Sequence, residues 1–228
     1  MKKIAIIPAR GGSKGLPGKN IKKLDGLELV FWSVDFALNS EVFGEVIITS
    51  DSDEILEVCK SRSVKTVKRP EQMATDESPV IDALLHALKD FKDDDMITLL
   101  QPTSPFRSKS VLNKALKSFG DKNSPCVSVK EDGDSPWSAF KAQDEHFLEP
   151  LFSTDKVNQR RQDYEKTYHL TGSLYVTKLA WLRDYKNFLK PKPTFVVTNG
   201  FENIDIDTLE DFEFAQFVVE NRKFIKDF

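Results

Sequence analysis

The sequence of 228 residues contains only two cysteines, Cys59 and Cys126, and no CxxC pair. A disulfide-stapled scaffold and a zinc–cysteine cluster are therefore excluded as organising features, and both thiols are expected to be reduced. No stretch approaches the roughly 18 apolar residues of a membrane-spanning helix, and the apolar run at residues 4–8 is too short for a signal peptide. We therefore expect a cytoplasmic protein that has no membrane partner.

The chain also lacks an excess of basic charge, since 33 Lys and Arg face 36 Asp and Glu for a net charge of −3. A globally basic surface for nucleic acid is therefore not expected. The near-neutral sum hides a segregation. Residues 1–24 hold seven basic side chains and no acidic one, and residues 193–221 hold seven acidic side chains and no Lys or Arg. The composition is thus compatible with a local cationic site for an anionic substrate.

Short apolar runs alternate with helical patterns along the chain. Strands are predicted at residues 3–8, 45–49, 64–68 and 96–100, with helices at 29–38, 54–61 and 79–91 between and after them. This rhythm predicts an α/β fold with a three-layer, mostly parallel sheet and helices on both faces. Two more strands (173–176 and 195–198) and a final helix (208 to about 224) follow. Because ligands bind outside the carboxyl ends of such strands, the loops after Pro8, Thr49 and Leu100 are candidate sites.

The rhythm fails between about residue 128 and residue 168. Aromatic and apolar side chains are spread there among polar ones without a clear period. We interpret this segment as an insertion for subunit contact within a single domain that covers residues 1–228.

A glycine-rich segment, PARGGSKGLPGKN at residues 8–20, follows the first strand. Glycines let backbone N–H groups approach an anion closely, and Arg10, Lys14 and Lys19 add cationic donors, which suits a polyphosphate. The segment is not an ATPase P-loop, because five residues separate Gly12 from Gly18 and asparagine follows the lysine. Nor is it a dinucleotide-binding GxGxxG motif, because its first two glycines are adjacent. The alternative is a solvated connecting loop.

The segment NIDIDT at residues 203–208 alternates polar and apolar residues. As a strand it would place Asp205 and Asp207 on one face with Cα atoms about 6.5 to 7 Å apart, near enough to bind one divalent cation. Magnesium is favoured because it keeps waters and shares its shell with substrate phosphates. For Asp207 the alternative is an N-cap of the final helix, since Glu210 lies three residues further on.

Five segments together carry a family resemblance: IIPARGGSKGLPGKN (6–20), KRPEQMATDESPV (68–80), TLLQPTSPFR (98–107), QRRQDYEKTYHLTGSLY (159–175) and IDIDTLEDFEFA (204–215). In this order the chain resembles the CMP-sialic acid synthetases, or acylneuraminate cytidylyltransferases. The resemblance implies a nucleotide-diphospho-sugar transferase-like fold and a homodimer. It also implies a Mg²⁺-dependent reaction for bacterial surface glycans such as capsule or lipopolysaccharide, in which CTP and a nonulosonic acid give the CMP-sugar and pyrophosphate.

The resemblance also implies roles for individual residues. Asp205 and Asp207 would bind the metal, and Arg10 and Lys19 would join them in neutralising charge as the sugar's anomeric hydroxyl attacks the α-phosphorus. The general base stays open between a metal-bound water and Asp205. The residues expected to bind the CTP phosphates are Arg10, Gly12, Ser13, Lys14 and Lys19; those for the cytidine are Asn20 and Arg69; those for the sugar are Gln101, Arg161 (from the same chain or from the partner subunit), His169, Thr171 and Tyr175.

Two positions depart from the family pattern, because Thr171 stands where asparagine is frequent and His169 where arginine is frequent. Both belong to the sugar-facing region, so N-acetylneuraminate, legionaminate and related diamino sugars stay open. One alternative function is a transferase for another 2-keto acid sugar, such as an eight-carbon octulosonate. Gln101 and the aspartate pair favour the nine-carbon branch. A second alternative is a nucleotide-binding relative that has lost turnover.

Overall fold

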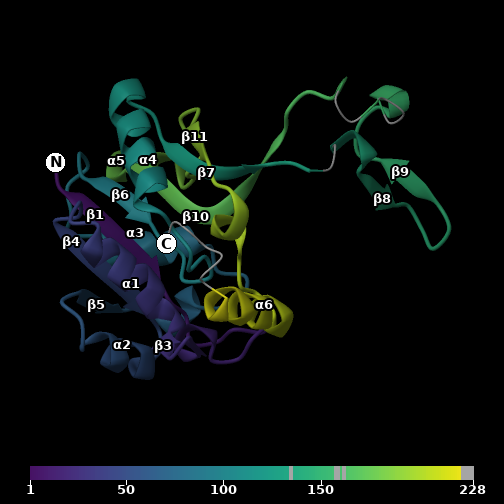
Figure 1. Cartoon of the computed structure of the whole chain (residues 1–228). Coiled ribbons are helices and arrows are strands. Elements are labelled where there is room, and N and C mark those ends of the chain that lie inside the picture. Colours follow the sequence, from purple (N-terminus) through teal and green to yellow (C-terminus); the bar gives the residue numbers. More distant parts are fainter. Residues whose placement is uncertain (134–135, 157–159, 161–162, 222–228) are drawn as a thin grey trace.

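The computed structural model describes residues 1–133, 136–156, 160 and 163–221. Its centre is a seven-stranded sheet in the order β11-β7-β10-β6-β1-β4-β5 (Figure 1). The neighbours of β1 and β4 all run parallel, as do β11 and β7, whereas β10 is antiparallel to both β6 and β7. The predicted α/β fold with a mostly parallel sheet is therefore confirmed. The strands are β1 (Lys3–Pro8), β4 (Glu45–Ser50), β5 (Lys65–Lys68), β6 (Met96–Leu99), β7 (Cys126–Glu131), β10 (Tyr168–Lys178) and β11 (Thr194–Val197).

Helices cover both faces of the sheet (Figure 1). Helices α1 (Leu29–Asn39), α2 (Asp53–Cys59) and α4 (Lys109–Lys122) pack on the face that carries Ala5 and Ile7. Helices α3 (Val80–Ala87) and α5 (Leu179–Tyr185) pack on the face that carries Ile4 and Ile6. Because both faces of β1 are covered, its sequence reads as a continuous apolar run rather than an alternating one.

A third apolar cluster fastens the C-terminal segment to the glycine-rich one. Helix α6 (Leu209–Glu220) buries Phe212 and Ala215, and Ile206 just before it is fully buried. These side chains pack with Leu16 of the glycine-rich segment and with Leu24. The acidic segment and the basic segment of the sequence are thereby brought together. In the chain, η1 (Lys19–Ile21) and the short strands β2 (Lys23–Leu24) and β3 (Leu27–Glu28) follow the glycine-rich segment and lead to α1.

The structure corrects several sequence predictions. Residues 126–131 form strand β7 of the main sheet, so the insertion begins after Glu131 and ends before Tyr168 rather than spanning 128–168. No strand forms at residues 203–208: Asn203 ends a short 3₁₀ turn, and residues 204–207 belong to no helix or strand. Helices α4 and α5 were not predicted, although Val111, Leu112, Ala115 and Phe119 of α4 form a buried stripe with helical spacing. The predicted end of the last helix near residue 224 lies outside the described residues.

The insertion forms an arm. Its strands β8 (Phe140–Ala142) and β9 (Leu148–Pro150) pair with each other in a separate small sheet. Figure 1 draws this sheet beyond the ends of β7 and β10, away from the helices that cover the main sheet. Of the helices that the structure describes, none has the length and apolar character to cross a bilayer. Short 3₁₀ turns lie at η2 (Glu71–Met73), η3 (Pro136–Ser138), η4 (Thr154–Lys156) and η6 (Gly200–Asn203).

Candidate functional site

A cavity of about 230 Å³ opens at the carboxyl ends of β1 and β6. Its walls are the glycine-rich segment, residues 69–80, the turn after β6 and the segment before α6. The candidate residues from four separate stretches of the sequence therefore meet here. Those that line the cavity are Arg10, Ser13, Lys19, Asn20, Arg69, Gln101 and Asp207.

The glycine-rich segment is held in one shape by close contacts. A Cβ atom on Gly15 would lie 2.3 Å from the carbonyl oxygen of Asp207, so only glycine fits there. The Asn20 side-chain amide donates to the carbonyl oxygen of Arg10 at 2.8 Å, and the Gly11 N–H donates to Asp51 Oδ1 at 3.1 Å. These bonds make the segment an ordered loop, which we call the glycine loop (residues 9–18), rather than a solvated connection.

Lys19 joins the glycine loop to the aspartate pair. Its side chain is buried, and its Nζ donates to the Ile206 carbonyl oxygen at 2.7 Å and to Asp207 Oδ1 at 2.9 Å. Ile206 is fully buried between the exposed Asp205 and Asp207, so the predicted alternation of faces persists without the predicted strand. The capping alternative for Asp207 is wrong, because Thr208 caps α6 and Asp211 completes the capping box.

The electrostatics of the aspartate pair suit a cation. Loss of hydration raises the pKa of Asp205, and the charge of Asp207 adds to the rise. A hydrogen bond from Thr103 and the positive charge of Lys19 lower the pKa and offset part of this rise. A cation would relieve this repulsion. Across the described residues, no group of three or more His, Cys, Asp and Glu side chains is placed to hold a metal. Two carboxylates are a donor set that suits Mg²⁺, because this ion takes one or two protein carboxylates and leaves the rest of its shell to water and substrate phosphates.

Arg69 also lines the cavity. Its guanidinium is buried, with Nη2 3.4 Å from Asp51 Oδ1, and this burial lowers its pKa. Its Nε is buried without a hydrogen-bond partner in the part of the chain that the structure describes. Arg69 therefore places a buried guanidinium, paired with Asp51, in the wall of the cavity.

The structure adds an acidic residue that the sequence reasoning missed. Asp76 lines the cavity and forms ion pairs with two cations of the glycine loop, Arg10 at 2.8 Å and Lys14 at 2.7 Å. Asp76 lies within the segment 68–80 that carries the family resemblance, and this position was the feature of the sequence that could have indicated it as a site residue. Lys14 therefore reaches the cavity through Asp76. Gly12 faces open space, since no atom would lie within 4 Å of a Cβ added there.

The predicted sugar-facing residues are dispersed. Of them, Gln101 lines the cavity, and its Oε1 would lie 2.8 Å from a Cβ on Gly172, so a side chain there would collide with it. The Tyr175 ring packs against Phe188 with centroids 5.2 Å apart, and burial raises its pKa, to which the charge of Asp205 contributes. The buried Thr171 hydroxyl lies away from the cavity lining and donates to Ser128.

Two further sugar-facing candidates do not reach the cavity in the structure. His169 is exposed, and its Nδ1 lies 2.9 Å from Asp132 Oδ2 near the base of the arm. Arg161 lies outside the described residues.

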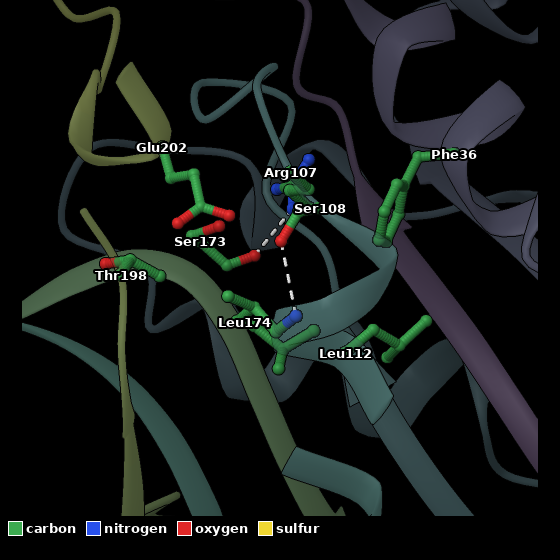
Figure 2. A pocket seen from close by; sticks show the side chains of 9 residues that line it. Phe36, Arg107, Ser108, Leu112, Ser173, Leu174, Thr198 and Glu202 are labelled. Atoms are coloured by element: carbon green, nitrogen blue, oxygen red, sulfur yellow. Dashed lines mark hydrogen bonds between the residues drawn. The ribbon is translucent and has the colours of Figure 1, made fainter. Parts of the chain in front are cut away.

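A buried arginine supports the Gln101 turn from beneath. Arg107 donates to the Ser173 carbonyl oxygen at 2.7 Å (Figure 2). It also donates to Ser33 Oγ at 2.9 Å and to the Gln101 carbonyl oxygen. Burial lowers its pKa to about 9, opposed by the charge of Asp205. The pocket beside it encloses about 10 Å³, which is room for about one water molecule at most. Arg107 is thus a structural support and the pocket is not a substrate site.

Comparisons with known proteins show which proteins the chain is similar to. An N-acylneuraminate cytidylyltransferase of Streptococcus agalactiae is 32% identical over 93% of this chain and 52% of its own length, so the chain spans about half of that relative. A pseudaminic acid cytidylyltransferase of Campylobacter jejuni is 32% identical over 95% of both chains. A CMP-N,N'-diacetyllegionaminic acid synthase of Legionella pneumophila is 30% identical over 96% of this chain and 97% of its own.

The fold also matches solved structures. A CMP:2-keto-3-deoxy-manno-octonic acid synthetase in complex with CTP superposes with a TM-score of 0.74 at 16% identity, covering 97% of this chain and 100% of that one. At this identity the match supports the fold alone. The family model described as Cytidylyltransferase matches residues 4–224. The chain therefore belongs to the cytidylyltransferase family.

Proposed function

We propose that this protein transfers CMP from CTP to the anomeric hydroxyl of a nine-carbon nonulosonic acid and releases pyrophosphate. The observation that carries the proposal is the meeting of the glycine loop, Lys19 and Asp207 at one cavity beyond the carboxyl ends of β1 and β6. Three relatives that match most of this chain are named for N-acylneuraminate, pseudaminic acid and N,N'-diacetyllegionaminic acid, which are all nonulosonic acids.

The nucleotide half of the mechanism uses the cavity walls. The backbone N–H groups of the glycine loop and the cations Arg10, Lys14 and Lys19 bind the triphosphate. Arg69, whose Nε lacks an acceptor among the described residues, and Asn20 hold the cytidine. Asp205 and Asp207 would hold Mg²⁺, which would supply charge neutralisation at the phosphates.

The chemical step is an in-line displacement. The anomeric oxygen forms a bond to the α-phosphorus as the bond from that phosphorus to pyrophosphate breaks. Such a transfer needs positioning and charge neutralisation more than covalent help from the protein. The buried ammonium group of Lys19 is fixed by two hydrogen bonds, so it meets the developing negative charge without reorganising.

The acid is proposed to bind on the side of Gln101, near Gly172 and Tyr175. Arg161, His169 and Thr171 remain proposed contacts for it, and in the isolated chain His169 and Thr171 lie apart from the cavity lining. We propose that a homodimer completes this side of the site. The arm supports the proposal, because it exposes apolar side chains of a kind that subunit interfaces cover: Phe147 (65% exposed), Leu148 (68%), Leu151 (54%) and Phe152 (50%).

A substrate panel tests the function. Purified protein with CTP and Mg²⁺ is offered N-acetylneuraminate, legionaminate, pseudaminate and an eight-carbon octulosonate, and pyrophosphate release is measured. We expect release with at least one nine-carbon acid. Turnover of the octulosonate alone would overturn the nine-carbon assignment, and CTP binding without turnover of any acid would favour a non-catalytic relative. The proposal places the reaction in the cytoplasm, because that compartment supplies CTP.

A further inference from the structure

The segment between η2 and α3 places a carboxylate inside the cation cluster of the glycine loop. Asp76 Oδ1 lies 2.8 Å from Arg10 Nη1, and its other oxygen, Oδ2, lies 2.7 Å from Lys14 Nζ. Both carboxylate oxygens are thus engaged by cations that the proposed function assigns to the triphosphate. The hydrogen bond from Lys14 is the main cause that lowers the pKa of Asp76, so the carboxylate is ionised at neutral pH.

The turn that carries Asp76 is built without help from the glycine loop. The hydroxyl oxygens of Thr75 and Ser78 lie 2.6 Å apart across Asp76, and the Ser78 N–H donates to the Thr75 carbonyl oxygen at 3.2 Å. Ser78 Oγ also donates to the Gln72 carbonyl oxygen at 2.6 Å. Since these bonds fix the backbone of the turn, the Asp76 side chain can leave the cations by rotating while the turn stays in place.

A carboxylate that bridges a guanidinium and an ammonium group uses the same donors that a phosphate group would use. We propose that Asp76 is a specificity-determining residue that competes, within the chain, with phosphate groups for Arg10 and Lys14. The inference rests on the proposed function, because it takes the glycine loop as the polyphosphate site. A ligand whose phosphates reach the two cations must displace Asp76, so part of its binding free energy is spent on breaking the two ion pairs.

The competition has different consequences for different ligands. Pyrophosphate and the β- and γ-phosphates of CTP must replace the Asp76 carboxylate at Arg10 and Lys14. Breaking the two ion pairs lowers the affinity of the chain for these ligands. CMP carries only the α-phosphate and leaves the Asp76 ion pairs intact. Asp76 therefore keeps pyrophosphate weakly bound and returns to the cations as pyrophosphate leaves, which favours product release over retention.

The test compares the wild-type chain with Asp76→Asn and with the neighbouring control Glu77→Gln. Dissociation constants for pyrophosphate, CTP and CMP are measured by calorimetry at low and at high salt, with Mg²⁺ held constant. Two exposed ion pairs are involved, so we expect Asp76→Asn to bind pyrophosphate about 3- to 10-fold more tightly at low salt, and CMP unchanged. The salt dependence should be steeper for the variant, because its two cations are free to attract the ligand. Glu77→Gln should match the wild type.

A second variant keeps the test decisive. Asp76→Ala removes the carboxylate without adding an amide that could itself bind phosphate, and it should show the same tightening. In a Lys14→Met background the gain from Asp76→Asn should shrink, because one of the two contested cations is gone. Unchanged or weaker pyrophosphate binding in both Asp76 variants would overturn the inference while leaving the proposed function standing. Absence of pyrophosphate and CTP binding in the wild type would overturn both.

Discussion

The nucleotide side and the acid side of the cavity are built differently. On the nucleotide side, Lys19 bonds to Ile206 and Asp207, and Gly15 lies against the Asp207 backbone, so each group is fixed by another. On the acid side, Gln101 lines the cavity, but His169 pairs with Asp132 near the base of the arm. The proposed nucleotide side is thus held together by contacts within one chain, whereas the candidate residues of the proposed acid side are dispersed.

This difference separates the two substrates in the molecule. Leu16 of the glycine loop and Ile206 of the acidic segment pack in the apolar cluster around α6, whereas His169, Thr171 and Tyr175 lie on β10. The proposed roles therefore predict that changes on β10 alter the acid without disturbing the CTP site. The relatives fit that division, since they share a cytidylyltransferase name or activity while their named acids differ.

The strongest challenge to the nucleotide side is Asp205→Asn, which removes one of the two carboxylates proposed to hold the metal. We expect a loss of at least about 100-fold in Mg²⁺-dependent pyrophosphate release, because charge at the reacting phosphate is no longer neutralised. The control is Glu210→Gln on the first turn of α6, which should keep its activity. Full activity of Asp205→Asn with Mg²⁺ would show that the metal assignment is wrong.

The same variant makes a prediction about stability. The pKa of Asp205 is raised in the folded protein, so its ionised form destabilises the fold at pH values above the folded pKa. Without divalent cation at pH 7, Asp205→Asn should therefore melt at the same temperature as the wild type or higher. As the pH falls below the unfolded pKa of an aspartate, the two melting temperatures should converge. A lower melting temperature at pH 7 would contradict the pKa shift.

Lys19→Met should weaken CTP binding by about 10- to 100-fold, because two charge-assisted hydrogen bonds to the acidic segment and a phosphate contact are lost together. Binding is measured by calorimetry at two salt concentrations, and the loss should be smaller at high salt. Lys23→Met, an exposed lysine four residues further on, serves as the matched control. Equal CTP affinity in the two variants would remove Lys19 from the site.

Gly15→Ala and Gly12→Ala form a matched pair on the same loop. The new Cβ at residue 15 would lie 2.3 Å from the Asp207 carbonyl oxygen, so the loop or the acidic segment must shift, at a cost of about 1–3 kcal/mol in unfolding free energy. At residue 12 nothing lies within 4 Å, and the stability should change little. Chemical denaturation measures both. Equal stability of the two variants would mean that the loop and the acidic segment are not in close contact.

Much of this organisation could be predicted from the sequence. The strands β1, β4 and β6 are continuous apolar runs because helices bury both of their faces, and that pattern is visible without a structure. The full length and antiparallel direction of β10 were not predicted, because β10 runs from an exposed arm into the core and so mixes exposed with buried positions. Helix α4 was not predicted either.

The site shows the same division between local and long-range information. The alternation around Ile206 predicted correctly which side chains face outward, but the strand itself was wrong, because the backbone N–H of Ile206 bonds to Thr103 in a loop rather than to a neighbouring strand. The role of Asp76 was missed because its partner Lys14 lies 62 residues away in the sequence. The role of Arg107 was missed because it depends on bonds to three separate parts of the chain. Sequence periodicity carries no record of such partners.

On the acid side, the arm variant Phe147→Ser/Leu148→Ser tests the proposed dimer. Both side chains are more than half exposed, and a partner subunit that covers them would lose apolar contact. We expect the dimer to dissociate at least about 10-fold more readily in sedimentation experiments. Phe214→Ser, which changes an exposed aromatic residue on α6 (52% exposed), is the control. Dissociation by the control but not by the arm variant would move the interface to α6.

The smallest effect is expected for His169→Asn, which separates the two sides most directly. The His169 side chain is largely exposed, so the loss of its contact with Asp132 should change stability little. The KM for CTP should stay within about 3-fold of the wild type, and any change should fall on the KM for the acid. A shift in the KM for CTP with an unchanged KM for the acid would mean that the base of the arm communicates with the glycine loop. The separation of the two substrates along the chain would then be wrong, because β10 would carry information to the nucleotide side.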